Sequence, residues 1–240
     1  MKQLKNNKNI VKIPKSILRI NMAQSMDGHT IQPDGKWALG STEDKRRMDR
    51  LRLWANCIIA SRKSIENDNP NLFARRKPGA KQPMPVIILK NVSKKISASS
   101  RIFNHPHPAG EFWVYGNKTP QITDIVDRSN LKEMSESSKK LLEKWKVFSF
   151  KNVKEVYSSL TERKFYKILL EGGPSLNGLF LQENLIDEIF FTIEPYLWAG
   201  QTSDRIITTP EMIPLQKFRL LTVEHRKNEV FFKYKRIKNN

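Results

Sequence analysis

Short hydrophobic runs, each about as long as a strand, recur along most of the chain and are separated by amphipathic stretches. Runs such as 58–59 (I-I) and 86–89 (V-I-I-L) contain no polar position, which is typical of strands buried on both faces of a parallel sheet. The pattern predicts strands at Ser16–Gln24, Asn56–Ala60, Pro85–Leu89, Glu111–Tyr115, Lys146–Phe150, Tyr166–Leu170 and Glu188–Glu194.

Helical patterns lie between several of these runs. Residues Thr42–Trp54 begin with hydroxyl-bearing caps and an acidic residue, and Lys132–Trp145 repeat Leu and Lys at helical spacing. Helices that alternate with single strands indicate an α/β fold with a mostly parallel central sheet flanked by helices. The end of the chain differs, because Lys217–His225 and Val230–Ile237 flank a polar turn and predict an antiparallel hairpin.

The composition supports a folded protein with a substantial core. Hydrophobic residues make up 38% of the 240 residues and include twelve Phe and five Trp, which excludes a disordered polyelectrolyte. No run approaches the ~18 apolar residues of a membrane helix. The single cysteine, Cys57, lies in an apolar strand pattern and is expected to be a small core residue. One cysteine permits no disulfide and no Cys-rich zinc site, so we expect a reducing compartment, the cytoplasm.

The net charge of +19 is unusual and is unevenly distributed. Residues 1–15 and residues 226–240 carry +5 each, which leaves +9 for residues 16–225. Residues 1–15 lack the apolar segment of a secretory signal peptide. We therefore expect a basic, partly disordered extension over 1–15 and one domain over 16–240. The charge indicates an anionic partner: nucleic acid, a membrane surface or a phosphorylated small molecule.

The segment 168–181 (I-L-L-E-G-G-P-S-L-N-G-L-F-L) is the most informative part of the sequence. An apolar strand ends at Glu171, two glycines permit a tight turn, and Pro174 suits the first position of a helix. Leu176, Leu179 and Phe180 are expected on one face of that helix. Such a turn directs backbone N–H groups and a helix dipole at the sheet edge and would bind an anion such as a pyrophosphate. An ordinary turn between strand and helix is the alternative, and the local pattern leaves both open.

Two further segments follow predicted strands. Residues 64–75 (S-I-E-N-D-N-P-N-L-F-A-R) are polar and indicate a loop at the carboxyl edge of the sheet, where α/β proteins usually bind ligands. Residues 25–28 (S-M-D-G) follow the first strand, and Trp37 lies a few residues beyond them. Taken alone, the first segment also fits an exposed turn, and Trp37 fits either a core position or stacking on a ligand.

Together these segments resemble the reductase domain of riboflavin biosynthesis, a family with a dihydrofolate-reductase-like fold. The family pattern has S-x-D-G, a tryptophan before a helix that ends in L-R, T-x-x-x-D-x-P-x-L-x-x-R, E-G-G-x-x-L, L-x-D-E and I-x-P-x-L-x-G. The matching positions here are 25–28, Trp37 with Ser41, 51–52, 64–75, 171–176, 185–188 and 193–200. Their order and approximate spacing hold from about residue 16 to 237.

The resemblance implies an NADPH-dependent reductase that transfers a hydride to the ribose C1′ of a ribosylaminopyrimidine 5′-phosphate. Asp68 and Glu171 would be the catalytic candidates for relaying a proton. The positions that match cofactor contacts are Ala23, Trp37, Ser64, Asp68, Gly172, Gly173, Pro174, Ser175, Leu176, Asn177, Gly178 and Leu179. The positions that match substrate contacts are Lys36, Arg52, Leu72, Arg75 and Glu171. Family members are commonly homodimers, so the resemblance also implies a homodimer.

The sequence departs from the family pattern at three places. Ser64 replaces a frequent Thr and keeps the hydroxyl, Asn69 replaces a frequent Asp, and a phosphate-binding Ser is missing beside Lys36, which would replace it. Many bacterial members are fused to a zinc deaminase with H-x-E and P-C-x-x-C motifs, and neither motif occurs here. We therefore expect a stand-alone reductase without a metal.

Two alternatives stay open at the level of sequence. One is a related NADPH-dependent reductase of another heterocycle, such as dihydrofolate. The other is a basic nucleic-acid-binding protein, although the sequence contains no recognition-helix, zinc-finger or RNP signature.

Overall fold

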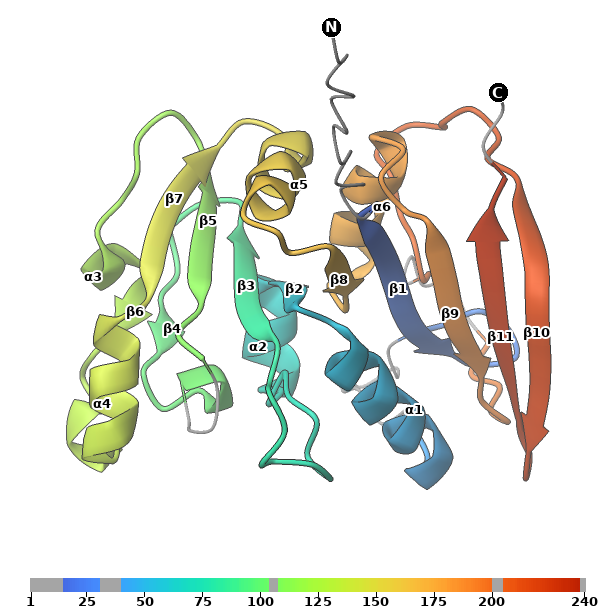
Figure 1. The fold of residues 1–240 in the computed structure, drawn as a ribbon, viewed down its shortest axis with the longest axis horizontal. Coiled ribbons are helices and arrows are strands. Elements are labelled where there is room, and N and C mark those ends of the chain that lie inside the picture. Colours follow the sequence, from blue (N-terminus) through green and yellow to red (C-terminus); the bar gives the residue numbers. More distant parts are fainter. Residues whose placement is uncertain (1–14, 31–39, 104–107, 200–204, 238–240) are drawn as a thin grey trace, which may run out of the picture.

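A nine-stranded sheet runs through the computed structural model, which describes residues 15–30, 40–103, 108–199 and 205–237 (Figure 1). Its strand order is β10-β11-β9-β1-β8-β2-β3-β5-β7. All neighbours are parallel except β11, which runs antiparallel to both β9 and β10. The strands are β1 (Ile17–Gln24), β2 (Cys57–Ser61), β3 (Met84–Leu89), β5 (Glu111–Tyr115), β7 (Lys146–Phe150), β8 (Lys167–Leu170), β9 (Glu188–Ile193), β10 (Phe218–Arg226) and β11 (Glu229–Arg236). A second sheet pairs β4 (Ile96–Ser97) with β6 (Val126–Asp127).

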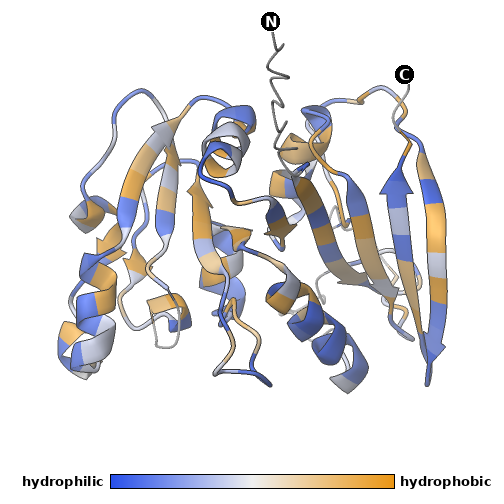
Figure 2. Cartoon of the chain, viewed as in Figure 1, coloured by the Kyte–Doolittle hydropathy of each residue, from blue (hydrophilic) through white to orange (hydrophobic). Residues whose placement is uncertain are grey.

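Helices cover both faces of the large sheet. They are α1 (Thr42–Trp54), α2 (Arg62–Asp68), α3 (Ile122–Ile125), α4 (Glu136–Glu143), α5 (Val153–Glu162) and α6 (Pro174–Gln182), with 3-10 turns at Arg101–Phe103 and Leu131–Glu133. In Figure 1, α1, α2 and α4 lie on one side and α5 and α6 on the other. Figure 2 shows that the apolar residues concentrate in the inner strands, whereas α1 is largely hydrophilic.

Successive side chains of the inner strands point to opposite faces of the sheet and form two separate hydrophobic cores. Ile58 of β2 belongs to the core beneath α1, α2 and α4, whereas its neighbour Ile59 belongs to the core beneath α5 and α6. Both side chains are fully buried. A strand with two buried faces must be apolar at every position, which is why these runs have no polar residue.

The predicted α/β fold with a mostly parallel sheet and a C-terminal hairpin is confirmed. Every strand predicted in the sequence is present, with ends that coincide or shift by one residue, and α1 has the predicted bounds. Cys57 is buried in β2, as predicted. No helix in the described ranges combines the length and the apolar character needed to cross a membrane.

Three predictions about local structure were wrong. The helix predicted over Lys132–Trp145 begins only at Glu136, because the Ser135 hydroxyl accepts the N–H of Ser138 and caps it there. The predicted loop 64–75 starts as part of α2, which the Ser61 hydroxyl caps in the same way. Leu179 does not share the buried face of α6. It is 42% exposed, because Leu176 and Phe180, one helical turn apart, define the buried side.

The order of strands places a crevice at the centre of the sheet. The chain leaves β1 to build β2, β3, β5 and β7, and then returns to insert β8 between β1 and β2 before adding β9 on the other side of β1. The carboxyl ends of β1, β8 and β2 are therefore adjacent while their following segments diverge. Open α/β sheets bind ligands at such a point.

Candidate active site

A cleft of about 390 Å³ opens at the carboxyl ends of β1, β2 and β8, between α1 and α2. Nine of the residues predicted from the sequence line it. They are Ala23, Arg52, Ser64, Asp68, Leu72, Arg75, Glu171, Gly173 and Pro174. The structure thus brings together residues from four separate segments of the chain.

An arginine–glutamate pair forms the fixed part of this cleft. Arg52 in the last turn of α1 donates from Nε to Oε1 of Glu171 at 2.8 Å and from Nη2 to Oε2 at 2.6 Å. Its Nη1 donates to the carbonyl oxygen of Phe73 at 3.0 Å. Burial alone would lower the pKa of Arg52, but the Glu171 carboxylate raises it above its ordinary value. This two-pronged geometry fixes the plane of the Glu171 carboxylate at the end of β8.

The glycine turn after β8 lies beside this pair. Gly173 is the N-cap of α6, Pro174 occupies the first turn, and no side chain among the described residues caps the helix. A Cβ on Gly173 would lie 3.6 Å from the Oγ atoms of both Ser61 and Ser64, so two hydroxyls from the β2–α2 junction face the turn. Uncapped N–H groups at a helix N-terminus, together with two hydroxyls, form a site suited to an anion.

Asp68 and Arg75 stand at the mouth of the cleft. Asp68 ends α2 and is exposed, yet desolvation by the surrounding wall raises its pKa. The Arg75 backbone N–H donates to Asp49 at 3.2 Å, while its side chain is exposed and has no ion pair with any described residue. Between them Leu72 is buried with a left-handed φ of 47°, which turns the loop back toward α1. Arg75 is therefore available to a ligand in a way that Arg52 is not.

Several predicted contact residues do not line this cleft. The Asn177 side chain is fully buried and donates to the carbonyl oxygen of Ile206 at 2.9 Å. A Cβ on Gly178 would lie 1.9 Å from the carbonyl oxygen of Thr208, so this glycine permits close packing of the backbone. The other predicted residues outside the lining are Gly172, Ser175, Leu176 and Leu179. Lys36 and Trp37 lie outside the described residues. For all of these positions a role in binding stays a prediction.

The cleft also contains residues that the sequence analysis did not single out. Asp44, Lys45 and Met48 line it from α1. Their spacing from Arg52, at eight, seven and four residues, was a signal that they share its helix face. Arg101 enters from a distant 3-10 turn, which is held by a hydrogen bond from its N–H to the Asn69 side chain at 2.8 Å. No local pattern predicts that contact.

A cluster of buried carboxyl groups holds the first turn of α1 to the hairpin. The Ser41 hydroxyl accepts the N–H groups of Glu43 and Asp44 and donates to Glu229 at 2.6 Å. Burial and the hydrogen-bonded Glu229 carboxyl raise the pKa of Glu194 to about 8. Burial also raises the pKa of Asp44, which accepts a hydrogen bond from Thr192 at 2.6 Å. This cluster contacts the cleft through Asp44.

The S-M-D-G segment after β1 has a structural role. Asp27 accepts a hydrogen bond from the Ser25 hydroxyl and others from the backbone N–H groups of Trp198 and Ala199, at 3.1 and 2.8 Å. These bonds lower the pKa of Asp27 to about 2. The aspartate therefore ties the loop after β1 to the segment after β9, beside the cleft.

A comparison with known protein families identifies the family to which this chain belongs. Residues 16–232 match the model of the RibD C-terminal domain. The chain belongs to the RibD C-terminal domain family. Membership in this family accounts for the joint order of the motifs described above, and for the position of the glycine turn at the centre of the sheet.

The relatives within the RibD family fall into long and short proteins. The riboflavin biosynthesis protein RibD of Bacillus amyloliquefaciens is 25% identical over 197 residues, which cover 79% of this chain and 48% of that protein. The chain thus spans about half the length of such relatives. The 2,5-diamino-6-ribosylamino-4(3H)-pyrimidinone 5′-phosphate reductase of Archaeoglobus fulgidus is 23% identical over 217 residues, which cover 85% of this chain and 91% of that protein.

Solved structures share the fold. The deaminase/reductase of Thermotoga maritima superimposes with a TM-score of 0.70 and 18% identity over 93% of this chain and 57% of that one. A pyrimidine reductase-like protein of Corynebacterium diphtheriae gives a TM-score of 0.69 and 20% identity over 93% of both chains. At this level of identity the likeness concerns the fold.

Proposed function

We propose that this protein is the NADPH-dependent reductase that converts the ribosyl group of a ribosylaminopyrimidine 5′-phosphate to a ribityl chain in riboflavin biosynthesis. Family membership and the archaeal reductase, which this chain matches along almost its whole length, support the assignment. In this proposal residues 16–240 form one reductase domain in the cytoplasm, preceded by the basic extension 1–15.

The main support for the proposal is that an anion site, an oriented carboxylate and an exposed cation lie together in one cleft. The N-terminus of α6 lies beside the fixed carboxylate of Glu171, and Arg75, which forms no ion pair with a described residue, stands at the mouth. A dinucleotide needs an anion site for its pyrophosphate, and a phosphorylated pyrimidine needs both a cation and hydrogen-bond acceptors. The cleft offers each of these next to the others.

The residues of the glycine turn fit a nicotinamide dinucleotide. Gly173 keeps the turn free of a side chain, and Ser61 and Ser64 direct hydroxyls toward it. The N–H groups of the first turn of α6 would bind the pyrophosphate, and Ser64 would bind the adjoining ribose. NADPH supplies the hydride when it is bound. The chain itself orients the two partners and excludes water between them.

The other side of the cleft fits the substrate. Both oxygens of Glu171 accept hydrogen bonds from Arg52, which leaves their outer lone pairs as oriented acceptors for the amino groups of a pyrimidine. Arg75 would bind the 5′-phosphate, since its side chain is free of described partners. Lys45 and Arg101 supply two further cations at the same mouth. In this proposal Arg52 positions Glu171 and does not bind the phosphate itself.

Asp68 is the stronger candidate to deliver a proton to the sugar oxygen. Desolvation raises its pKa, so more of it is protonated at a given pH than of an ordinary aspartate. Glu171 is held as an acceptor by Arg52 and has no comparable freedom. Replacing Asp68 by Asn is expected to lower kcat with little change in the affinity for NADPH.

NADPH oxidation tests the function directly. The reaction is followed by loss of nicotinamide absorbance, with the diaminopyrimidinone phosphate and with its deaminated uracil analogue as separate substrates. Turnover of either supports the proposal. Turnover of dihydrofolate with neither pyrimidine would contradict it and favour the related-reductase alternative.

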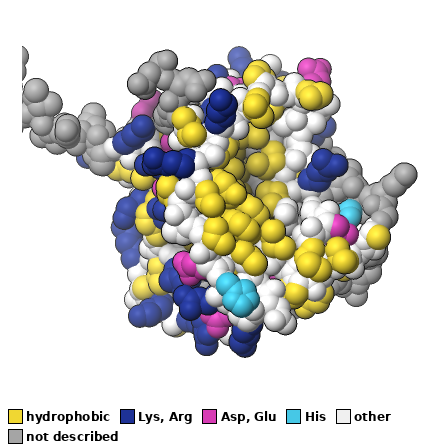
Figure 3. Space-filling view, turned by 90° about the vertical axis from the view of Figure 1, so that its right-hand side faces the viewer, with side chains coloured by type: hydrophobic (Ala, Val, Ile, Leu, Met, Phe, Trp, Pro, Cys, Tyr) yellow, Lys and Arg dark blue, Asp and Glu magenta, His cyan; other side chains and the backbone are white. Residues whose placement is uncertain are grey.

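We further propose a homodimer that forms through β10. Eight of its nine residues are exposed, including Leu220, Leu221 and Val223 at 45%, 37% and 52%. Figure 3 shows hydrophobic side chains gathered in the middle of the face formed by this end of the molecule. An exposed edge strand that carries apolar side chains is a ready interface for a second copy.

Oligomeric state tests this part of the proposal. Light scattering at micromolar concentration is expected to give a dimer, and Val223→Lys is expected to give monomer. Tyr115→Lys is the matched control, because Tyr115 is 58% exposed on β5, far from β10 in the sheet order. A monomeric wild-type protein would refute the dimer.

A further inference from the structure

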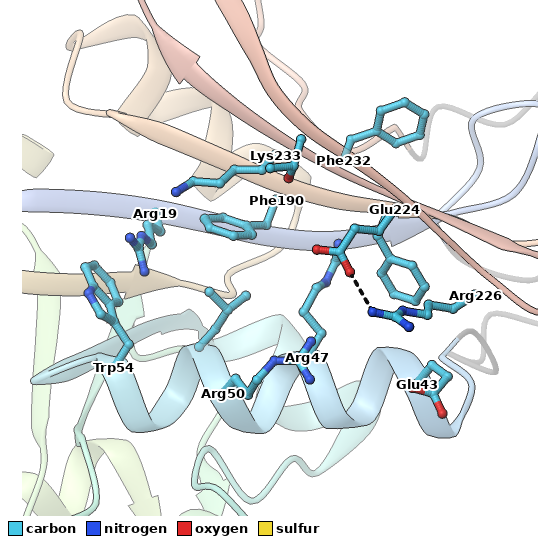
Figure 4. A pocket seen from close by; sticks show the side chains of 13 residues that line it. Arg19, Glu43, Arg47, Arg50, Trp54, Phe190, Glu224, Arg226, Phe232 and Lys233 are labelled. Atoms are coloured by element: carbon cyan, nitrogen blue, oxygen red, sulfur yellow. Dashed lines mark hydrogen bonds and ion pairs between the residues drawn. The ribbon is translucent and has the colours of Figure 1, made fainter.

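A second pocket lies on α1, outside the cleft. It is a groove of about 610 Å³ between the helix and the strands β1, β9, β10 and β11 (Figure 4). We call it the α1 groove. Five cations, two carboxylates and the rings of Trp54, Phe190 and Phe231 face it. The lining residues are Arg19, Glu43, Arg47, Arg50, Leu51, Trp54, Phe190, Thr222, Glu224, Arg226, Phe231, Phe232 and Lys233.

The helix separates the groove from the active-site cleft. The α1 residues that line the groove are Glu43, Arg47, Arg50, Leu51 and Trp54, whereas Asp44, Lys45, Met48 and Arg52 line the cleft. Each set follows the three-to-four-residue spacing of one helix face. The groove is therefore a separate pocket, and the reductase function assigns no role to it.

Positive charge is in excess within the groove. Arg19 and Lys233 share one carboxylate, that of Glu188, at 2.7 and 3.4 Å. Arg50 is exposed and forms no hydrogen bond or ion pair with any residue the structure describes. Neighbouring cations without equal numbers of carboxylates raise the local concentration of anions.

A buried guanidinium also lines the groove and leaves one of its donors unsatisfied. Arg47 is only 7% exposed, and Figure 4 shows it crossing the groove from α1 toward the strands. Its terminal nitrogens donate to the carbonyl oxygen of Phe191 and to Thr192, and Nη2 also pairs with Asp44 at 3.4 Å. Its buried Nε, however, has no hydrogen-bond partner among the described residues. A buried donor without a partner is costly, and a ligand oxygen would remove that cost.

Aromatic rings orient the cations. The Arg19 guanidinium lies 3.6 Å from the centre of the Trp54 ring, and Lys233 lies 5.3 Å from that of Phe190. A guanidinium stacked on a ring keeps its donor edge directed outward. The rings thus hold the cationic end of the groove in place without consuming all its donors.

The two ends of the groove differ in charge. In Figure 4, Arg19 and Lys233 lie at the end with Trp54, whereas Glu43, Glu224 and Arg226 lie at the other. Arg226 is paired with Glu224 at 3.3 Å. A phosphate would fit the first end, and the carboxylates at the second would accept hydrogen bonds from hydroxyl or amino groups.

We propose that the α1 groove binds a small phosphorylated molecule with a hydroxylated or amino-bearing ring system, of the size and chemistry of a nucleoside monophosphate. Its phosphate contacts Arg50 and the Arg19–Lys233 end, and its ring system extends toward Glu224. The volume lies within the range of small-molecule sites. Because the phosphate recognises exposed cations, affinity falls as ionic strength rises.

Calorimetric titration tests the proposal without measuring reductase activity. The four common ribonucleoside monophosphates are titrated into the full chain, with the matching nucleosides and inorganic phosphate as separate arms. We expect at least one nucleotide to bind with a Kd of about 1 mM or tighter. Arg50→Glu and the milder Arg50→Gln are expected to weaken it, the first by at least about tenfold.

Two matched variants locate the binding. Lys140→Glu makes the same charge change at an exposed position of α4 and is expected to bind like wild type. Arg75→Glu alters the cleft and is also expected to leave this binding unchanged. Arg50 has no described partner, so its variants are expected to keep the wild-type melting temperature, which separates lost binding from lost folding.

Three results would overturn the proposal. They are the absence of binding by all four nucleotides, equal binding of nucleoside and nucleotide, and loss of binding in Arg75→Glu in place of the Arg50 variants. The last result would mean that the nucleotide occupies the cleft. None of them bears on the reductase assignment, which depends on NADPH oxidation.

Discussion

Arg50 and Arg52 are two residues apart on α1 and face different pockets. Arg52 is 2% exposed and holds both oxygens of Glu171 within 2.8 Å, whereas Arg50 is exposed and has no described partner. A buried charge must be neutralised in a fixed geometry, but an exposed one is stabilised by water and stays available. On the cleft side of α1, Arg52 thus orients a carboxylate, whereas on the groove side Arg50 offers a charge that can bind an anion.

The largest effect is expected from breaking the Arg52–Glu171 pair. Arg52→Met leaves the Glu171 carboxylate nearly buried without its partner, which is expected to cost about 3–5 kcal/mol of unfolding free energy. Arg50→Met, on the other side of α1, is expected to change it by less than about 0.5 kcal/mol. Urea denaturation measures both, and equal losses would show that the two sides do not differ as we describe.

A double variant separates stability from catalysis at the same pair. Arg52→Met combined with Glu171→Gln removes the uncompensated charge and is expected to recover part of the lost stability. It is not expected to recover turnover, because the oriented acceptor is gone. Recovery of turnover would exclude Glu171 from the reaction.

The next largest effect on stability is expected at Gly178 of α6, where the helix backbone packs closely against the backbone of Thr208. In Gly178→Ala, the new Cβ would meet the carbonyl oxygen of Thr208 at 1.9 Å, so the backbone must shift, at an expected cost of about 1–3 kcal/mol. Gly79→Ala is the control, because a Cβ there would have no described atom within 4 Å. Thermal unfolding of both variants makes the comparison, and an unchanged Gly178 variant would show that α6 is loosely placed.

A smaller effect on stability, which depends on pH, is expected from Glu194 in the buried carboxyl cluster at the first turn of α1. The pKa of Glu194 rises from 4.5 to about 8 in the folded protein, so its contribution to stability is complete below pH 4.5 and is lost as pH rises toward 8. The charged and titratable groups around it are Glu229, Asp44 and Arg47.

Glu194→Gln removes this titration. We expect its melting temperature to exceed that of wild type by a few degrees at pH 8 and to approach it near pH 4.5. Scanning calorimetry across this range measures the difference. A gap that is constant with pH would mean that Glu194 does not titrate in this interval.

The sequence predicted the framework well and the long-range contacts poorly. Strands such as β2 and β3 could be predicted from continuous apolar runs, because both faces of these strands are buried. The glycine turn was identified because Gly173 and Pro174 have conformational preferences that can be seen locally. Asp44 and Met48 could have been found from their helical spacing to Arg52.

Other features could not be predicted, because they depend on contacts between segments that are far apart in the sequence. Arg52 was interpreted as a substrate contact, because nothing near it in the sequence shows that Glu171 would occupy its donors. The α1 groove was not predicted, because one wall comes from α1 and the other from the C-terminal hairpin. Residue type indicates what a side chain can bind, but only topology decides whether a partner inside the protein binds it first.

The arginine–glutamate pair also limits how this protein can evolve. A single mutation at either Arg52 or Glu171 creates a buried charge without its partner, so the intermediate is less stable than both the starting pair and a neutral pair. Lineages that change one position should therefore change the other as well. Across related chains the two sites are expected to covary, and a relative that has lost both would be a candidate for a different substrate.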